Sequence, residues 1–181
     1  MRAVLASIKP RYCSLIEARD KGLEVRKTVP NLPTPFKVYI YETKGKIDEP
    51  WIDEDGHHIY TGRGQVVGEF ICDYISAIAL TFDGLADVVD CEMSCLTPRE
   101  LFKYADGKPI YGWHISDPVF YEKPKDLSEF YKAGTLSNAD FEYQLYDGSG
   151  DPRRRSYASY LFTQAIRRPP QSWCYVEVVD A

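Results

Sequence analysis

Residues 21–27 alternate polar and apolar side chains with a period of two, which is the pattern of a β-strand with two unlike faces. Leu23 and Val25 share one face, and we expect that face to pack on a core. Glu24 and Arg26 share the other face. The pattern therefore predicts a β-rich fold that presents a charged pair near its amino end.

Further short apolar segments typical of strands occupy residues 2–8, 37–41, 65–80, 111–121 and 172–179. Helix signals are fewer: Pro10 opens one short helix, and Thr97 with Glu100 forms a capping box that starts another. The regular helices of βαβ units are mostly missing. This arrangement predicts an α+β, mainly β fold, in which the strands form a closed or nearly closed barrel.

Two polar stretches interrupt the strand pattern, at about residues 43–65 and 132–156. The first contains an aspartate-glycine turn between two short apolar pairs, which indicates a hairpin. We find no internal repeat and no second core. We therefore expect residues 1–181 to form a single domain that carries two insertions.

The formal net charge of −5 means that a polyanion repels the chain as a whole. Nucleic-acid binding would need a local basic patch or a pocket for one base. The arginine clusters that could contact a nucleic-acid backbone are Arg153, Arg154, Arg155, Arg167 and Arg168. The sequence has no long apolar run and no secretory signal at its start, so we expect a cytoplasmic protein without a membrane partner.

The amino end also resembles a known family. Phage and bacterial members of the ASCH family, a branch of the PUA-like superfamily, carry a serine-isoleucine-lysine-proline run, a helix, and then a glycine-x-lysine-x-x-glutamate-x-arginine run. The matching residues here are Ser7, Ile8, Lys9, Pro10, Lys21, Glu24 and Arg26. Arg19 stands where the glycine is usual.

The resemblance continues in residues 68–70, 101–116 and 169–173. It implies a PUA-like β-barrel that binds RNA or a single nucleobase, modified or unmodified. The residues expected to form this pocket are Ser7, Lys9, Lys21, Glu24, Arg26, Trp113 and His114. Cations can hold a phosphate or a base carbonyl there, and a carboxylate can accept from an exocyclic amine. The alternative interpretation is an exposed ion pair that contributes little to stability.

Two other functions remain open. A nucleoside-directed hydrolase, either an amidohydrolase or a ribonuclease, would use Lys21 and Glu24 for general acid–base work. In ASCH amidohydrolases that act on acylated cytidine, a threonine follows the lysine by three residues; Glu24 occupies that position here and offers no hydroxyl nucleophile. A phage adaptor that binds a host protein is the third possibility.

Metal and cofactor sites have little support in the sequence. His57 and His58 are adjacent on the expected hairpin and therefore point to opposite faces, while Cys91 and Cys95 are a single pair. Among further carboxylates, Glu69 has no assigned role and Glu100 is expected to cap a helix. No glycine-rich phosphate loop is present. We expect neither a metal nor a cofactor, and free thiols at the five cysteines.

Overall fold

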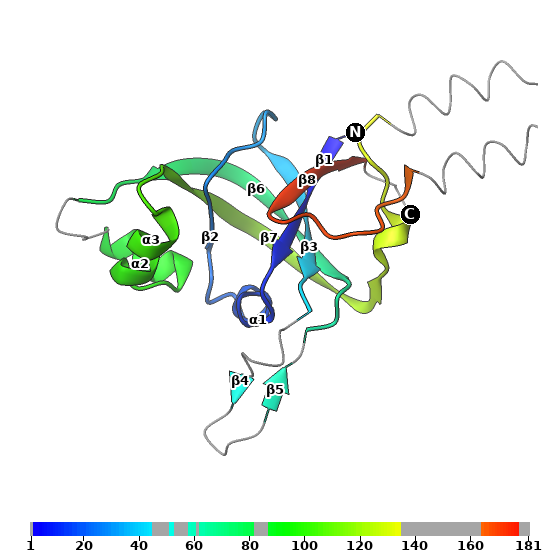
Figure 1. The fold of residues 1–181 in the computed structure, drawn as a ribbon, viewed down its shortest axis with the longest axis horizontal. Coiled ribbons are helices and arrows are strands. Elements are labelled where there is room, and N and C mark those ends of the chain that lie inside the picture. The colour runs from blue at the N-terminus through cyan, green and yellow to red at the C-terminus, as the bar shows by residue number, and fades with distance from the viewer. Residues whose placement is uncertain are drawn as a thin grey trace, which may run out of the picture.

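The structure, a computed structural model, describes residues 2–44, 62–81, 87–134 and 164–177, together with the backbone of 51–52 and 58–60. A six-stranded mixed sheet runs in the order β2-β7-β6-β3-β1-β8 (Figure 1). Neighbouring strands are antiparallel except β1 and β3, which are parallel. The strands are β1 (Arg2–Ile8), β2 (Leu23–Arg26), β3 (Phe36–Glu42), β6 (Val66–Ile78), β7 (Ile110–Lys125) and β8 (Trp173–Glu177).

The helices are short, as the sequence predicts. They are α1 (Pro10–Glu17), α2 (Val88–Ser94), α3 (Pro98–Ala105) and the single turn η1 (Leu127–Glu129). The predicted capping box at the start of α3 is confirmed, since Thr97 accepts from the Glu100 backbone and Glu100 accepts from the Thr97 backbone. The α+β, mainly β prediction is likewise confirmed. A separate pair, β4 (Trp51–Ile52) with β5 (His58–Tyr60), forms the hairpin expected in the first insertion.

The predicted barrel is not closed by a backbone ladder in the described part of the chain. Strands β2 and β8 are the two edges of the sheet, and side chains join them instead. Arg26 at the end of β2 donates to the Ser172 carbonyl next to β8 at 3.1 Å, and the Trp173 indole donates to Thr28 Oγ1 at 3.0 Å. The two edges of the sheet therefore meet through polar side chains, without a backbone ladder between them.

Both faces of β2 are buried, which corrects the expectation of an exposed charged face. Leu23 and Val25 pack in a cluster with Leu101 of α3. Glu24 lies opposite Trp113 in the β2–β7 ladder, so its side chain points to the other face, where Trp113 belongs to the main core. The period of two separated the faces correctly. It could not reveal that α2 and α3 cover the apolar face while the curl of the sheet covers the charged one.

Strand β7 departs from a strict alternation of its two faces. Trp113 is fully buried and Ile115 packs against the same core, but Val119, which strict alternation would also turn inward, is 53% exposed. The strand continues past Pro118 with an irregular register against β6, and Asp117 adopts a left-handed φ of 47°. This irregularity shifts the alternation by one position, so that Val119 faces outward.

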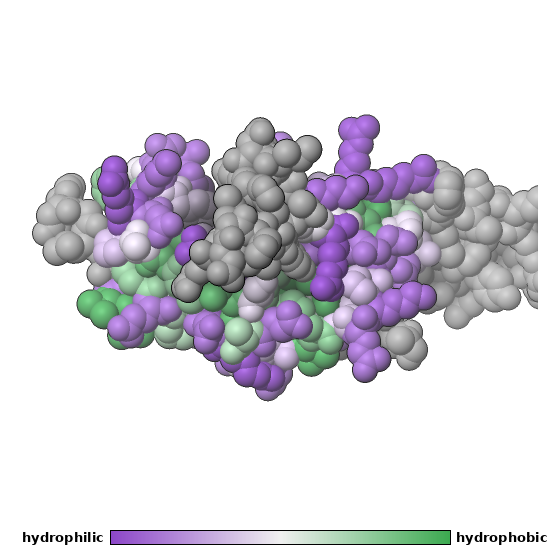
Figure 2. All heavy atoms as spheres, turned by 90° about the horizontal axis from the view of Figure 1, so that it is seen from below, coloured by the Kyte–Doolittle hydropathy of each residue, from purple (hydrophilic) through white to green (hydrophobic). Residues whose placement is uncertain are grey.

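The α2–α3 end of the molecule exposes several apolar side chains. Val88 and Val89 of α2 are 68% and 58% exposed, and Phe102 of α3 is 54% exposed. At this end Figure 2 shows hydrophobic residues (green) at the surface among hydrophilic ones (purple). Residues 135–163 lie outside the described residues, and with them most of the second predicted insertion. None of the described helices is long and apolar enough to cross a membrane.

Candidate functional site

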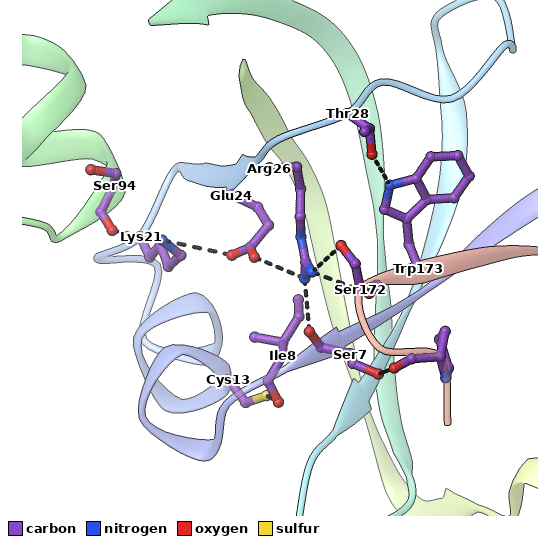
Figure 3. A network of polar contacts seen from close by, with 11 residues as sticks. Ser7, Ile8, Cys13, Lys21, Glu24, Arg26, Thr28, Ser94, Ser172 and Trp173 are labelled. Atoms are coloured by element: carbon purple, nitrogen blue, oxygen red, sulfur yellow. Dashed lines mark hydrogen bonds and ion pairs between the residues drawn. The ribbon is translucent and has the colours of Figure 1, made fainter. Parts of the chain in front are cut away.

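Lys21, Glu24 and Arg26 form a continuous row of opposite charges along β2, shown in Figure 3. The Lys21 Nζ atom lies 3.7 Å from Glu24 Oε2, and Arg26 Nη2 lies 2.9 Å from Glu24 Oε1. The three residues are only 2%, 7% and 5% exposed. This row is therefore not the exposed ion pair of the alternative interpretation. Burying three charges is costly, and each must be compensated by its neighbours.

Lys21 forms the α2 end of the row. Its Nζ donates to the Ser94 carbonyl at 2.6 Å, and the adjacent Gly22 amide donates to the Met93 carbonyl at 2.9 Å. The last carbonyls of α2 thus hold the segment that leads into β2, and helix carbonyl ends favour cations. Burial lowers the pKa of Lys21 below its ordinary value, although Glu24 opposes this shift.

Arg26 forms the other end of the row and joins three separate segments. Its Nη1 donates to the carbonyl and the hydroxyl of Ser172, both at 3.1 Å, and its Nη2 donates to the Ser7 carbonyl at 2.8 Å. Ser7 in turn donates its hydroxyl to the Pro170 carbonyl at 2.6 Å. The Arg26 Nε–H is buried and has no hydrogen-bond partner among the described residues.

The structure brings four of the seven predicted pocket residues together in this network: Ser7, Lys21, Glu24 and Arg26. Trp113 lies on the same face as Glu24, although its ring packs between core aromatics, and its buried Nε1–H also lacks a partner within the part described. Lys9 is exposed at the start of α1.

His114 does not belong to the row. It follows Trp113 directly in β7, so its side chain projects from the opposite face of the sheet. There its ring lies 3.3 Å from the Ser76 hydroxyl and beside the ring of Tyr74. His114 is therefore separated from the row by the sheet itself.

Tyr12 and Tyr104 lie near the row, although neither was predicted to belong to the site. Burial raises the pKa of Tyr12 in α1, and the negative charge of Glu24 acts in the same direction. Burial also raises the pKa of Tyr104 in α3; the positive charge of Arg26 opposes this shift and Glu24 adds to it. Both phenols are therefore within electrostatic reach of the row. In the sequence, only the arginine that precedes Tyr12 could have signalled a role beyond packing.

The remaining candidates lie elsewhere or beyond the described residues. Glu69 of β6 pairs with Lys37 at 2.6 Å and accepts from the Tyr121 hydroxyl at 2.5 Å, while Glu100 caps α3. Arg167 and Arg168 are exposed in the segment that precedes β8. The other arginine cluster, at 153–155, is outside the described part. All five cysteines have free thiols, as predicted.

The curled mixed sheet with its short helices is an α+β, mainly β fold. No family model matches the sequence, and no curated protein sequence matches it. A comparison with solved structures shows that the fold is similar to that of the ASCH protein of Zymomonas mobilis. The crystal structure of a serine-to-alanine variant of that protein is 15% identical, covers 97% of this chain and 88% of its own, and has a TM-score of 0.51.

Two further structures of the Zymomonas mobilis protein resemble this chain less closely. A tyrosine-to-phenylalanine variant gives a TM-score of 0.49 at 15% identity, with 97% of this chain and 90% of that chain covered. The ASCH structure itself gives 0.48 at 13% identity, with 89% and 94% covered. The serine-to-alanine variant, with its TM-score of 0.51, confirms the predicted resemblance at the level of the fold.

Proposed function

We propose that this protein binds RNA, or a single nucleobase or nucleoside, at the Lys21–Glu24–Arg26 row. The observation that carries the proposal is the burial of three charged side chains in one line, with donors on Arg26 and Trp113 left unpaired among the described residues. Perturbed and costly charge clusters are concentrated at functional sites. The fold shared with ASCH proteins supports the same function.

The chemistry of the row fits the edge of a base. Glu24 supplies acceptor oxygens for an amino or imino group, as carboxylates do with exocyclic amines. The unpaired Nε–H of Arg26 supplies a donor for a ring nitrogen or carbonyl.

Isothermal titration calorimetry with the common ribonucleosides and short RNAs tests this proposal. We expect Glu24→Gln, which keeps the shape of the side chain but removes its charge, to weaken binding about tenfold or more. Glu69→Gln is the matched control, because Glu69 pairs with Lys37 outside the row. Equal affinities of Glu24→Gln and the unaltered protein would exclude the row as the binding site.

A second function, hydrolysis of an acylated nucleoside, draws on one specific observation. Burial lowers the pKa of Lys21, and Glu24 lies beside its amine. Such a pair can shuttle a proton while water adds across an amide. Incubation with an acetylated cytidine tests this function: released acetate that disappears in Lys21→Met supports it, whereas no release by the unaltered protein excludes it for that substrate.

A further inference from the structure

Near each end of the buried row, the ring of a tyrosine lies beside a further cation. At the Lys21 end, the Lys21 Nζ lies 4.8 Å from the centre of the Tyr12 ring, and the guanidinium of Arg11 lies 5.8 Å from the same ring. The Tyr12 ring thus connects a buried cation with an exposed one.

The Arg26 end also has a tyrosine ring beside an outer cation. The Lys27 Nζ lies 5.3 Å from the centre of the Tyr104 ring, and Arg26 directly precedes Lys27 in the chain. Lys27 immediately follows β2 and is partly exposed. The proposed path therefore has Arg11 and Tyr12 at one end, the row of Lys21, Glu24 and Arg26 in the middle, and Lys27 with Tyr104 at the other end.

The charges along this path alternate in sign, and this alternation favours one orientation of a bound nucleotide. Cations lie at both ends, and the carboxylate of Glu24 lies in the middle. A phosphate is repelled from the centre and attracted to the ends, whereas an amino group of a base is attracted to the centre. The aromatic rings hold the outer cations in place before a ligand arrives, which lowers the entropic cost of binding.

One acidic group opposes this pattern. Hydrogen bonds from Thr97 lower the pKa of Glu100, and Arg11 acts on Glu100 in the same direction, so Glu100 is also near the Arg11 end. Its carboxylate is already occupied by the backbone and the hydroxyl of Thr97, 2.8 Å away in each case. Glu100 therefore reduces the attraction of this end for a phosphate and leaves Lys27 as the stronger contact.

We propose that a single-stranded nucleic acid lies across the row, with one phosphate at Arg11, another at Lys27, and the intervening base turned toward Glu24. The inference rests on the proposed function and specifies how the strand crosses the site. The strand must be single, because the Watson–Crick edge of a base in a duplex is already paired and the base cannot turn toward Glu24 without leaving the stack. It places the backbone contacts on α1 and at the end of β2, instead of at the arginines of residues 167–168.

Salt dependence of binding tests this path. Fluorescence anisotropy with a short labelled single-stranded RNA, and with its DNA equivalent, is measured over a series of KCl concentrations. Each lost phosphate contact lowers the slope of log K against log salt by about 0.7 for a single strand, so the double variant Arg11→Gln, Lys27→Gln is expected to lose about 1.4. A DNA strand that gives the same slopes shows that the phosphates alone are read at these two positions.

Two control variants remove cations elsewhere: Lys123→Gln on β7, and the pair Arg167→Gln, Arg168→Gln before β8. Both are expected to keep the slope of the unaltered protein. If the Arg167 and Arg168 pair lowers the slope and the Arg11 and Lys27 pair does not, the proposed path is wrong. Thermal melting establishes that each variant is folded.

Failure of the path is distinguishable from failure of the proposed function. Arg11 and Lys27 contact phosphates and not the base, so their double variant is expected to bind nucleosides as the unaltered protein does. Nucleoside binding that persists, together with an unchanged salt slope, overturns the path alone. Absence of both nucleoside and RNA binding in the unaltered protein overturns the function and the path together.

Discussion

At the scale of the residue, Glu24 is the side chain on which the site depends. It is the only carboxylate among the described residues that pairs with both Lys21 and Arg26, and all three are buried. Its position follows from the alternation of β2, but its burial follows from the surrounding layers. Glu24 therefore neutralises two cations that are almost entirely buried.

Removing this carboxylate should destabilise the protein strongly. We expect Glu24→Ala to lower the free energy of unfolding by about 3–5 kcal/mol, because two buried cations lose their counter-charge. Urea denaturation measures the change. Glu24→Gln retains hydrogen-bond acceptance and is expected to cost less than Glu24→Ala; a loss below about 1 kcal/mol in Glu24→Ala would contradict the account.

Glu69 should make stability depend on pH on the acid side. Burial alone would raise its pKa, but hydrogen bonds from Lys37 and Tyr121 outweigh burial and lower the pKa below its ordinary value of 4.5. The native state then binds fewer protons than the unfolded state near that pH, so the stabilisation is complete above about pH 4.5 and is lost as the pH falls through the lowered pKa.

Urea titrations at a series of pH values measure this effect. Glu69→Gln should be less stable than the unaltered protein at neutral pH, and the difference should shrink as the pH falls below about 4.5. A difference that stays constant over this range would show that Glu69 contributes no pH dependence.

At the scale of the element, the close approach of the paired strands β6 and β7 depends on Gly68. A Cβ atom at this position would meet the Val119 carbonyl oxygen and, at 3.1 Å, the Phe120 Cα, and both belong to the backbone of β7. Backbone cannot rotate away as a side chain does. The pairing of β6 with β7 shifts register between Val66 and Gly68, so the close approach of the two strands lies at this glycine.

Gly68→Ala should therefore destabilise the sheet by about 1–3 kcal/mol through overpacking. Chemical denaturation measures the loss. Gly107→Ala is the matched control for crowding, because a Cβ there meets nothing within 4 Å, although its φ of 71° adds some strain. A Gly68→Ala protein as stable as the unaltered one would mean that β6 and β7 can separate at little cost.

How far the sequence predicts each element depends on whether its signal is local. The capping box at Thr97 and the proline at the start of α1 depend on neighbouring residues, and both helices were predicted. The outward turn of Val119 and the closure of the edges through Arg26 depend on contacts between distant segments, which no local pattern records.

The candidate site likewise has features that the sequence predicts and features that only the packing reveals. The face shared by Glu24 and Arg26 was predictable from a period of two, whereas their burial was not. Tyr104 was missed because α3 is far from β2 in the sequence, and only the packing of Leu101 against β2 brings the two together. His114 was included because it is adjacent to Trp113 in the sequence, although adjacent residues of a strand point to opposite faces.

At the scale of the whole molecule, Arg26 joins the two edges of the curled sheet. It connects β2 with the end of β1 and with the residue before β8. Arg26→Lys keeps the charge but cannot make the same set of contacts, since one ammonium replaces a planar fork of donors. We expect this variant to open the edges of the sheet before its centre.

Hydrogen exchange followed by mass spectrometry measures this opening. Peptides from β8 should exchange faster in Arg26→Lys, whereas peptides from β3 and β6, in the centre of the sheet, should change little. Lys123→Gln on β7 serves as the comparison for a general effect of substitution. Equal acceleration in all strands would contradict a specific role for Arg26 at the edges.

The most direct test of the central claim is a calorimetric titration of the unaltered protein and Glu24→Gln with one short single-stranded RNA at low salt. The account predicts saturable binding by the unaltered protein and at least about tenfold weaker binding by the folded Glu24→Gln variant. Binding of the same strength by both proteins, or no binding by the unaltered protein, would contradict it.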